Sequence, residues 1–221
     1  MIDVPGAAEA VEKVAPGKYE VLTFPTMNEV MAALRSGRID AAQTYEDYAN
    51  FIMKSDDGLT FTRGDAPPAS LSMLTREADV ELTTALNSAI ETLKENGKLD
   101  ELYEQYVANA SPDDVPEAPE IATIDGAKTI TVGVSGDFPP HDYVSVDGRP
   151  AGYNVALMGE IAQLAGFNVA FETAGFNTKF SGLVSQRIDL FFLHAGHTAF
   201  EGIIQTAAYD EEVYLGRLTL K

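Results

Sequence analysis

Three histidines are the residues of this chain whose type and spacing most directly suggest chemistry. His194 and His197 form an H-x-x-H pair after the apolar segment RIDLFFL, and His141 lies in a separate loop. Imidazole is a common zinc ligand, so these three, or the pair with Glu201, have the ligand types of a zinc site. H-x-x-H in a loop is a weak metal signature without a third ligand of known geometry. We therefore expect polar pocket histidines that titrate near neutral pH, and predict no metal and no cofactor.

A second group of candidate ligand-binding residues follows the ends of predicted strands. The carboxyl ends of parallel strands line the ligand crevice of open α/β sheets. The candidates are Asp137, Phe138 and Tyr143 after TITVGV, Phe176 after FNVAFETA, and His197 and Thr198 after RIDLFFL. The alternative for Phe138 and Phe176 is core packing, and Asp137 could instead cap the turn before two prolines. Gly6 begins a predicted helix whose free backbone amides could bind an anion.

No catalytic motif accompanies these residues. The sequence contains no G-x-S-x-G, no phosphate loop, no H-E-x-x-H and no G-x-G-x-x-G. It has no cysteine, which excludes disulfides, thiolate metal sites and a cysteine nucleophile. The residues therefore predict a binding protein and not an enzyme.

Alternating strands and helices must hold the candidate residues in place. We expect strands at 19–24, 39–42, 59–62, 69–75, 167–174, within 187–195 and at 211–220, with another from Thr129. Amphipathic helices are expected at 27–37, 46–54, 79–97 and 99–107, and an apolar helix after Asp147-Gly148. This alternation favours an α/β fold with parallel strand pairing.

Two features suggest how the chain is divided. Residues 34–44 and 183–193 both contain a helix end, a short turn and Arg-Ile-Asp before a buried strand, as expected for two lobes built from one unit. Residues 110–127 carry three prolines, five acidic residues and no base. That composition predicts an extended, exposed and mobile linker.

The charge of the chain limits its partners. Its 221 residues include 34 acidic and 15 basic ones, for a net charge of −19. Such a chain repels nucleic acid and anionic lipid headgroups. We expect a solvated acidic surface, with attraction for a cationic ligand as the alternative. No apolar run reaches the length of a membrane span, and the first residues lack the pattern of a signal peptide. A signal or anchor is therefore expected to have been removed or to lie elsewhere.

Four motifs together resemble the amino-acid-type extracellular solute-binding proteins, family 3. They are GVSGDFPPHDY (133–143), G-x-x-x-G-Y-N-V (148–155), SGRIDAA (36–42) and K-x-N-G-K-L-D-E-L-Y-E-Q-Y (94–106). The resemblance implies a two-lobed, type 2 periplasmic-binding-protein-like (flytrap) α/β fold that closes on its ligand by hinge bending. The part resembling the family's beginning comes second here, which indicates either one circularly permuted unit or a cut through a tandem array.

The resemblance also implies a division of the chain. Residues 1–68 correspond to the lobe that is usually second, and 69–109 to a crossover strand and terminal helices packing on the other lobe. Residues 110–127 are the linker. Residues 128–221 correspond to the lobe that is usually first, ending in a crossover strand.

The family's α-amino-acid clamp is incomplete in this sequence. An arginine that pairs with the ligand carboxylate is expected near Glu201-Gly202, where none occurs. The helix-start threonine corresponds to Ala7 or Ala8, and the acid that pairs with the ammonium falls at or beside Tyr45. We therefore expect Tyr45 to join the site and common α-amino acids to bind weakly.

The function implied is capture of a small polar ligand between two lobes for ABC-type uptake, outside the cell or in the periplasm. The alternative is the sensing domain of a membrane receptor, such as a histidine kinase or a cyclic-dinucleotide signalling protein. A dehydratase-like enzyme on the same fold is the lesser alternative. The partners implied are a membrane transporter or receptor and no nucleic acid, with tandem association or self-association left open.

Overall fold

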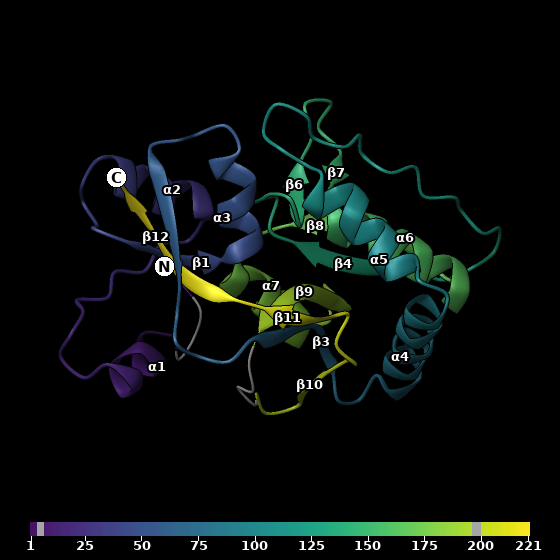
Figure 1. Cartoon of the computed structure of the whole chain (residues 1–221). Coiled ribbons are helices and arrows are strands. Elements are labelled where there is room, and N and C mark those ends of the chain that lie inside the picture. Colours follow the sequence, from purple (N-terminus) through teal and green to yellow (C-terminus); the bar gives the residue numbers. More distant parts are fainter. Residues whose placement is uncertain (4–6, 196–199) are drawn as a thin grey trace.

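Two sheets, each built from both halves of the sequence, define two lobes (Figure 1). The structure is a computed structural model that describes residues 1–3, 7–195 and 200–221. The chain passes between the two sheets through residues 64–68, which join β2 to β3, and through Tyr214, which joins β11 to β12.

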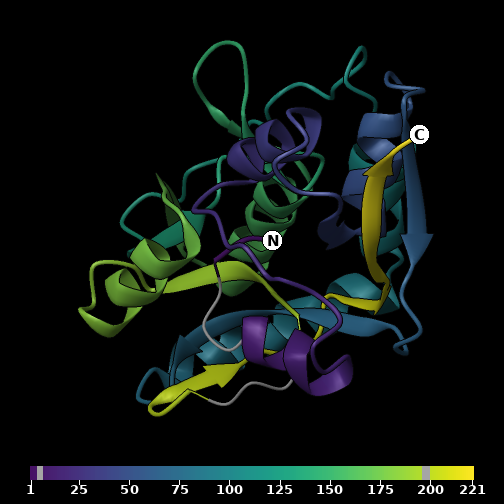
Figure 2. The same ribbon diagram turned by 90° about the vertical axis from the view of Figure 1, so that its left-hand side faces the viewer.

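The small lobe contains a three-stranded antiparallel sheet in the order β1-β12-β2. Its strands are β1 (Ala42–Tyr45), β12 (Leu215–Leu220) and β2 (Leu59–Arg63), and Figure 2 shows β12 beside β2. Helices α2 (Met27–Arg35) and α3 (Glu46–Met53) pack on this sheet and bury Val30, Leu34 and Tyr48. Helix α2 begins where the Thr26 hydroxyl accepts the Glu29 amide, and it ends before Gly37, which has φ of 71°.

The large lobe contains a sheet in the order β10-β3-β9-β4-β8, with β11 also paired to β3. The strands are β3 (Ala69–Arg76), β4 (Thr129–Val134), β8 (Asn168–Thr173), β9 (Leu190–Ala195), β10 (Ile203–Gln205) and β11 (Asp210–Val213). Strand β4 runs parallel to β8 and β9, whereas β3 is antiparallel to its neighbours. The carboxyl ends of β4, β8 and β9 therefore lie at one edge, as in other open α/β sheets.

Helices α4 (Val80–Glu95), α5 (Lys98–Tyr103) and α6 (Tyr153–Ala165) pack together on this sheet, and α7 (Phe176–Val184) contacts β3 and β9. A π-helical turn, Glu104–Ala108, extends α5. Strands β5 (Asp137–Phe138), β6 (Asp142–Val144) and β7 (Pro150–Ala151) form a small sheet against α6, and α1 (Ala7–Val14) lies at the edge of the molecule (Figure 1). No helix within the described ranges is both long enough and apolar enough to cross a membrane.

The two halves of the chain are interwoven. Strand β3 from the first half lies between β9 and β10 from the second, and β12 from the second half lies between β1 and β2 from the first. Leu86, Ile90 and Leu102 share one hydrophobic core with Val132 and Leu157. Neither half alone therefore contains the whole main sheet of either lobe or the whole of the large hydrophobic core.

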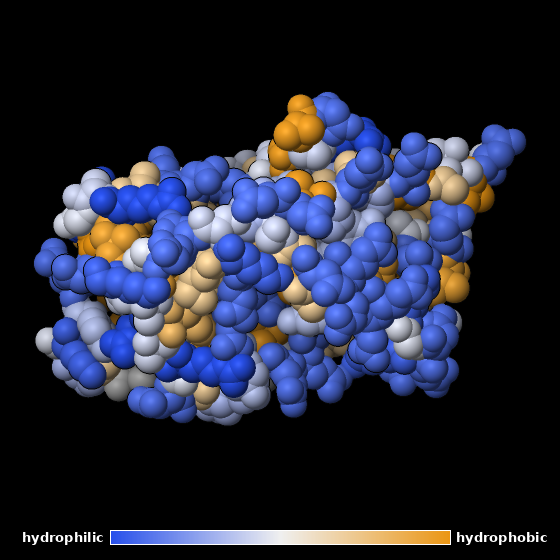
Figure 3. All heavy atoms as spheres, turned by 45° about the horizontal axis from the view of Figure 1, so that its top comes forward, coloured by the Kyte–Doolittle hydropathy of each residue, from blue (hydrophilic) through white to orange (hydrophobic). Residues whose placement is uncertain are grey.

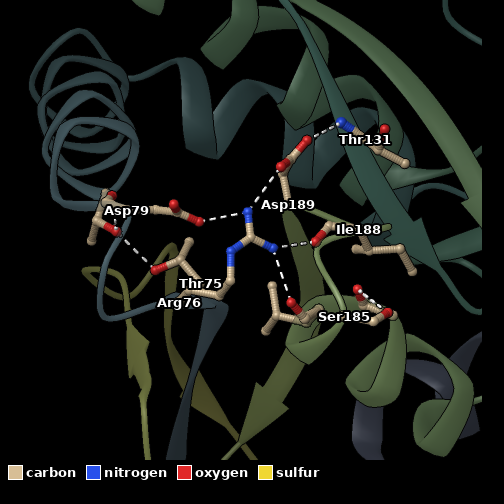
Figure 4. Close-up of polar contacts among 10 residues, drawn as sticks. Thr75, Arg76, Asp79, Thr131, Ser185, Ile188 and Asp189 are labelled. Atoms are coloured by element: carbon tan, nitrogen blue, oxygen red, sulfur yellow. Dashed lines mark hydrogen bonds and ion pairs between the residues drawn. The ribbon is translucent and has the colours of Figure 1, made fainter.

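Arg76 at the end of β3 links three parts of the large lobe (Figure 4). Its guanidinium pairs with Asp79 at 2.6 Å and Asp189 at 2.9 Å, and donates to the carbonyl of Ile188 at 2.6 Å. Asp189 also accepts the Thr131 amide of β4 at 2.8 Å. This network joins β3, α4 and the start of β9 at the edge of the sheet opposite the carboxyl ends of the parallel strands.

Several sequence-based expectations about elements are corrected by the structure. The strand predicted at 19–24 does not form. Phe24 is the one residue of this range that makes a β-bridge, and its partner is Ile2. The strand predicted at 39–42 lies at Ala42–Tyr45. The strand predicted at 211–220 is two strands in different sheets, separated at Tyr214.

The segment 110–127 contains turns at 112–113 and 125–126 and otherwise irregular backbone, and it is tied to the large lobe. Asn168 exchanges hydrogen bonds with the backbone of Ile124 at 2.8 and 2.9 Å, and Gln163 donates to the Ala122 carbonyl at 2.8 Å. Ile121 packs over Gly159 of α6, where the absence of a side chain leaves room. Apolar and amide contacts that composition does not reveal therefore hold this segment.

Candidate functional site

The boundary between the lobes is crossed by the segment that follows β4. This segment forms β5 and the turn to β6, and its residues contact α2 and α3 of the small lobe. The Asp142 carboxylate holds the segment at its base, accepting the amides of Ser135 at 2.6 Å and Gly136 at 3.0 Å and the Asn154 side chain at 3.0 Å. Because Asp142 is fully buried, these bonds fix the direction in which the following residues point.

Asp137 lies at the amino terminus of helix α2. Its carboxylate accepts the backbone amide of Asn28 at 3.1 Å, and the positive end of the helix favours this negative charge. Burial raises the pKa of Asp137, and the amides of Asn28 and Met27 partly offset that rise. A large-lobe carboxylate thus occupies an anion-binding position of the small lobe.

Phe138 lies in the hydrophobic core of the small lobe. Its ring stacks on Tyr48 at 5.0 Å between centroids and meets Tyr45 edge-on at 5.7 Å. His141 also stacks on Phe138, with ring centroids 5.8 Å apart. The structure therefore brings Asp137, Phe138 and Tyr45 together at the lobe boundary, with Phe138 packed against protein side chains.

Lys179 of α7 is a buried cation beneath the same segment. Its ammonium donates to the Ser135 hydroxyl at 2.7 Å, and the stem passes close to Gly133, where a Cβ would lie 3.1 Å from the Lys179 Cγ. Burial lowers the pKa of Lys179, and the charges of Asp142 and Asp137 oppose that change. This lysine supplies positive charge near the carboxyl ends of the parallel strands.

A hollow of about 560 Å³ opens between α3, α5 and the strands that join the lobes. We call it the interlobe pocket; it is lined by Glu46, Asp47, Arg63, Lys94, Leu99, Asp100, Tyr103, Tyr153, Tyr209, Asp210, Glu211, Glu212 and Tyr214. Both of its cations are paired, Arg63 with Glu46 at 2.5 Å and Lys94 with Glu211 at 2.5 Å. A smaller hollow of about 200 Å³ lies under residues 119–123, away from the lobe boundary.

The lining of the interlobe pocket suits a cationic or neutral polar solute. Six carboxylates face two cations, so the lining carries a negative charge. Burial raises the pKa of Asp210, and the nearby charge of Asp47 adds to that rise. Tyr103 and Tyr153 meet edge to face at 6.2 Å beside the carboxylates, and Tyr103 is the partly exposed ring of the two. Such walls bind cations through ring faces as well as charge.

The other predicted site residues lie elsewhere. The Tyr143 hydroxyl donates to the Pro116 carbonyl at 3.1 Å. Phe176 packs with Phe180 and Phe191 at the start of α7. Gly6, His197 and Thr198 lie outside the described residues. The H-x-x-H pair therefore stays a prediction, and the side chains that the structure describes contain no group of three or more metal-ligand residues.

Sequence reasoning missed Lys179 and the interlobe pocket. The sequence does contain a signal for the pocket, because YDEEVY at 209–214 places three acids between two tyrosines. Lys179 occupies an apolar face of α7 and has no such signal.

The family of the chain follows from its sequence match. The model of the bacterial extracellular solute-binding proteins, family 3, matches residues 4–109 and 130–199. The chain therefore belongs to this family of extracellular solute-binding proteins, which confirms the resemblance. Together with the two sheets, the match confirms the two-lobed, type 2 α/β fold.

Individual similar proteins are more distant. The L-cystine-binding protein TcyA of Bacillus subtilis (strain 168) is 31% identical over 91 residues, which cover 41% of this chain and 34% of TcyA. An ancestral arginine-binding protein bound to arginine is 15% identical with a TM-score of 0.45, over 97% of this chain and 72% of that one. The BvgS periplasmic VFT2 domain of Bordetella pertussis is 12% identical with a TM-score of 0.44, over 96% and 68%. The chain thus spans about a third of the curated relative that it matches.

Proposed function

We propose that this chain is an extracellular solute-binding domain that captures a small polar molecule between its lobes for ABC-type uptake, and that it acts by binding, without catalysis. The family match carries the proposal. The interlobe pocket of about 560 Å³, lined from both lobes and from the joining strands, supports it, because ligand sites of this size commonly occur between domains.

The chemistry of the lobe boundary supports a cationic or neutral solute over an α-amino acid. The only cations among the described lining residues, Arg63 and Lys94, are already paired. Asp137 already occupies the amide position at the start of α2, so an incoming carboxylate would have to displace it. A missing bidentate charge pair typically lowers affinity by roughly 10²- to 10³-fold.

A ligand screen tests this proposal. We expect the melting temperature to rise with a polyamine or another small organic cation and to change little with common α-amino acids, since a ligand that binds only the folded state stabilises it. Asp210→Asn and Asp100→Asn should weaken binding in the interlobe pocket. Glu91→Gln, on an exposed face of α4, is the matched control for loss of one charge. Submicromolar binding of an ordinary α-amino acid would contradict the proposed ligand class.

The second candidate function is ligand sensing within a membrane receptor. The observation that favours it is the packing of Phe138 in the small-lobe core, because side chains of the protein itself then hold the lobes together. The full-length gene and its neighbours would distinguish the two functions. Neighbouring transporter genes would favour uptake, whereas a transmembrane helix followed by a signalling domain in the same gene would favour sensing.

We also propose that the chain is one circularly permuted unit. The interwoven sheets support this, since the main sheet of each lobe contains strands from both halves. A protease site inserted between the exposed residues Asp125 and Gly126 would test it. After cleavage the two fragments should remain together on size exclusion, as buried strands and not the linker join them. Fragments that separate would favour a cut through a tandem array.

The acidic surface fits an exported binding protein. Figure 3 shows a face dominated by hydrophilic residues, on which apolar residues form small separate groups. A net charge of −19 keeps such a protein soluble and disfavours nucleic acid as a partner.

A further inference from the structure

Helix α3 lies on the side of the small lobe that faces the large lobe, and it contacts the last helical segment of that lobe (Figure 1). This segment consists of α5 and the π-helical turn Glu104–Ala108. Near the start of α3, the Asp47 carboxylate accepts the Tyr103 hydroxyl of α5 at 2.8 Å. The end of α3 makes a second and larger set of polar contacts with the same part of the large lobe.

Lys54 is the residue at which α3 ends, and its ammonium reaches across the lobe boundary. It donates to the carbonyl of Ala108 at 2.6 Å and to that of Ala110 at 2.6 Å. The last carbonyls of a helix lack partners within the helix, and a lysine ammonium suits both these acceptors and the negative end of the helix dipole. The Ser55 hydroxyl donates to the Asp113 carboxylate at 2.5 Å. We call these three hydrogen bonds the α3 clasp.

Each side of the α3 clasp is anchored in its own lobe. On the small-lobe side, Ala49 of α3 lies in the hydrophobic core, and Asp56 after the helix pairs with Arg35 of α2 at 3.0 Å. On the large-lobe side, Tyr106 and Val107 of the π-helical turn lie in the large hydrophobic core. The clasp therefore connects the packed parts of the two lobes.

We propose that the α3 clasp restrains the opening of the two lobes, and that Lys54 is the positioning residue of this restraint. The chain crosses between the lobes at residues 64–68 and at Tyr214, and two-lobed proteins bend at such connections. The clasp adds a third, noncovalent connection. Opening moves α3 away from the π-helical turn of the other lobe, so it must break the hydrogen bonds made by Lys54 and Ser55.

The restraint raises the share of molecules in the arrangement described above, which we call closed. Hydrogen bonds from a charged donor are stronger than those between neutral groups, and Lys54 makes two of them. A binding protein that is mostly closed before it meets its solute loses less affinity to the closing step. The inference rests on the two-lobed fold and on contacts outside the interlobe pocket, so it holds for any class of solute.

Distance measurement between the lobes tests the restraint. The chain has no cysteine, so the double variant Ala32→Cys on α2 and Leu164→Cys on α6 carries one spin label on each lobe at exposed positions. In this background, Lys54→Met combined with Ser55→Ala should raise the ratio of open to closed molecules about tenfold in pulsed electron spin resonance, since the loss of charge-assisted hydrogen bonds typically has an effect of this size.

Three comparisons make the test specific. Lys54→Arg retains a charged donor for the two carbonyls and should keep the ratio near that of the wild type. Lys128→Met removes one positive charge at an exposed position of the large lobe and should leave the ratio unchanged. Cleavage at a protease site inserted between Asp125 and Gly126 should also leave it unchanged, because every residue of the clasp precedes that cut.

An unchanged distance distribution in the Lys54→Met, Ser55→Ala variant would overturn the restraint. A lower melting temperature without a change in the distances would overturn it as well, because the contacts would then stabilise the fold without controlling its opening. The measurement needs no ligand, so its failure would leave the proposed solute binding to be judged by the ligand screen alone.

Discussion

The ring of Phe138, from the segment that follows β4, stacks on Tyr48 of the small lobe with centroids 5.0 Å apart and ring planes 11° apart. Both rings are buried, and Tyr45 meets Phe138 at nearly a right angle, 83°. An aromatic residue predicted to face a ligand thus anchors one lobe in the hydrophobic core of the other.

Phe138→Ala should lower the free energy of unfolding by about 3 kcal/mol, because truncating a buried phenylalanine removes apolar burial and leaves a cavity. Phe138→Leu retains most of the apolar volume. It should lower the free energy of unfolding by about 1 kcal/mol, chiefly because the ring stacking is lost. Urea denaturation would measure both values. Equal effects of the two variants would indicate that the ring geometry, and not the filled volume, supplies most of the stabilisation.

Gly152 should tolerate no side chain. It has φ of 101°, and a Cβ there would lie 2.6 Å from the carbonyl oxygen of His141 and 2.7 Å from that of Pro140. We expect Gly152→Ala to lower the free energy of unfolding by more than about 3 kcal/mol, since strain and overpacking add. Gly148→Ala is the matched control, with φ of 81° and no atom within 4 Å of the added Cβ. Gly148→Ala should lower the free energy of unfolding by about 1 kcal/mol, because backbone strain alone opposes it.

The sequence predicted most elements that have a strong local signal. Helix α4 has apolar periodicity and ends before Gly97, which has φ of 75°, so its position follows from local chemistry. The segment at 19–24 alternates like a strand, but a strand also needs a partner, and only Phe24 finds one. Pairing between distant segments is a tertiary property that residue alternation does not contain.

The candidate site was less predictable than the fold. The turn after β4 was expected at a strand end, and Asp137, Phe138 and Tyr45 do meet there. The interlobe pocket was not predicted, because its carboxylates come from α3, α5 and β11, which are distant in sequence. Lys179 was missed because a lysine in an amphipathic helix is usually exposed.

The two Arg-Ile-Asp repeats should differ in their contribution to stability. Asp189 of the second repeat bonds to Arg76 and to the Thr131 amide, whereas Asp40 of the first is exposed. Asp189→Ala should lower the free energy of unfolding by about 3 kcal/mol, because the Arg76 guanidinium and the Thr131 amide would each lose the Asp189 carboxylate as a partner. Asp40→Ala is the matched control and should change the free energy of unfolding by less than about 0.5 kcal/mol. Similar losses in both variants would contradict the assignment of stability to the Arg76 network.

Lys179 should make stability depend on pH in the alkaline range. Burial lowers its pKa from 10.5, so the folded protein releases this proton at a lower pH than the unfolded chain does. Between the lowered pKa and the ordinary value the unfolded state binds more protons, and the free energy of unfolding therefore rises with pH.

Lys179→Met keeps most of the apolar stem and removes the titrating group. The stability of the wild type minus that of Lys179→Met should accordingly increase as the pH rises towards the ordinary pKa of lysine, as measured by urea denaturation at fixed ionic strength. Lys128→Met, at an exposed position, is the control for loss of one positive charge. If the difference for Lys179→Met stayed constant with pH, the amine would have to be solvated in the folded protein, and the cation beneath the Ser135 hydroxyl would not be buried as described.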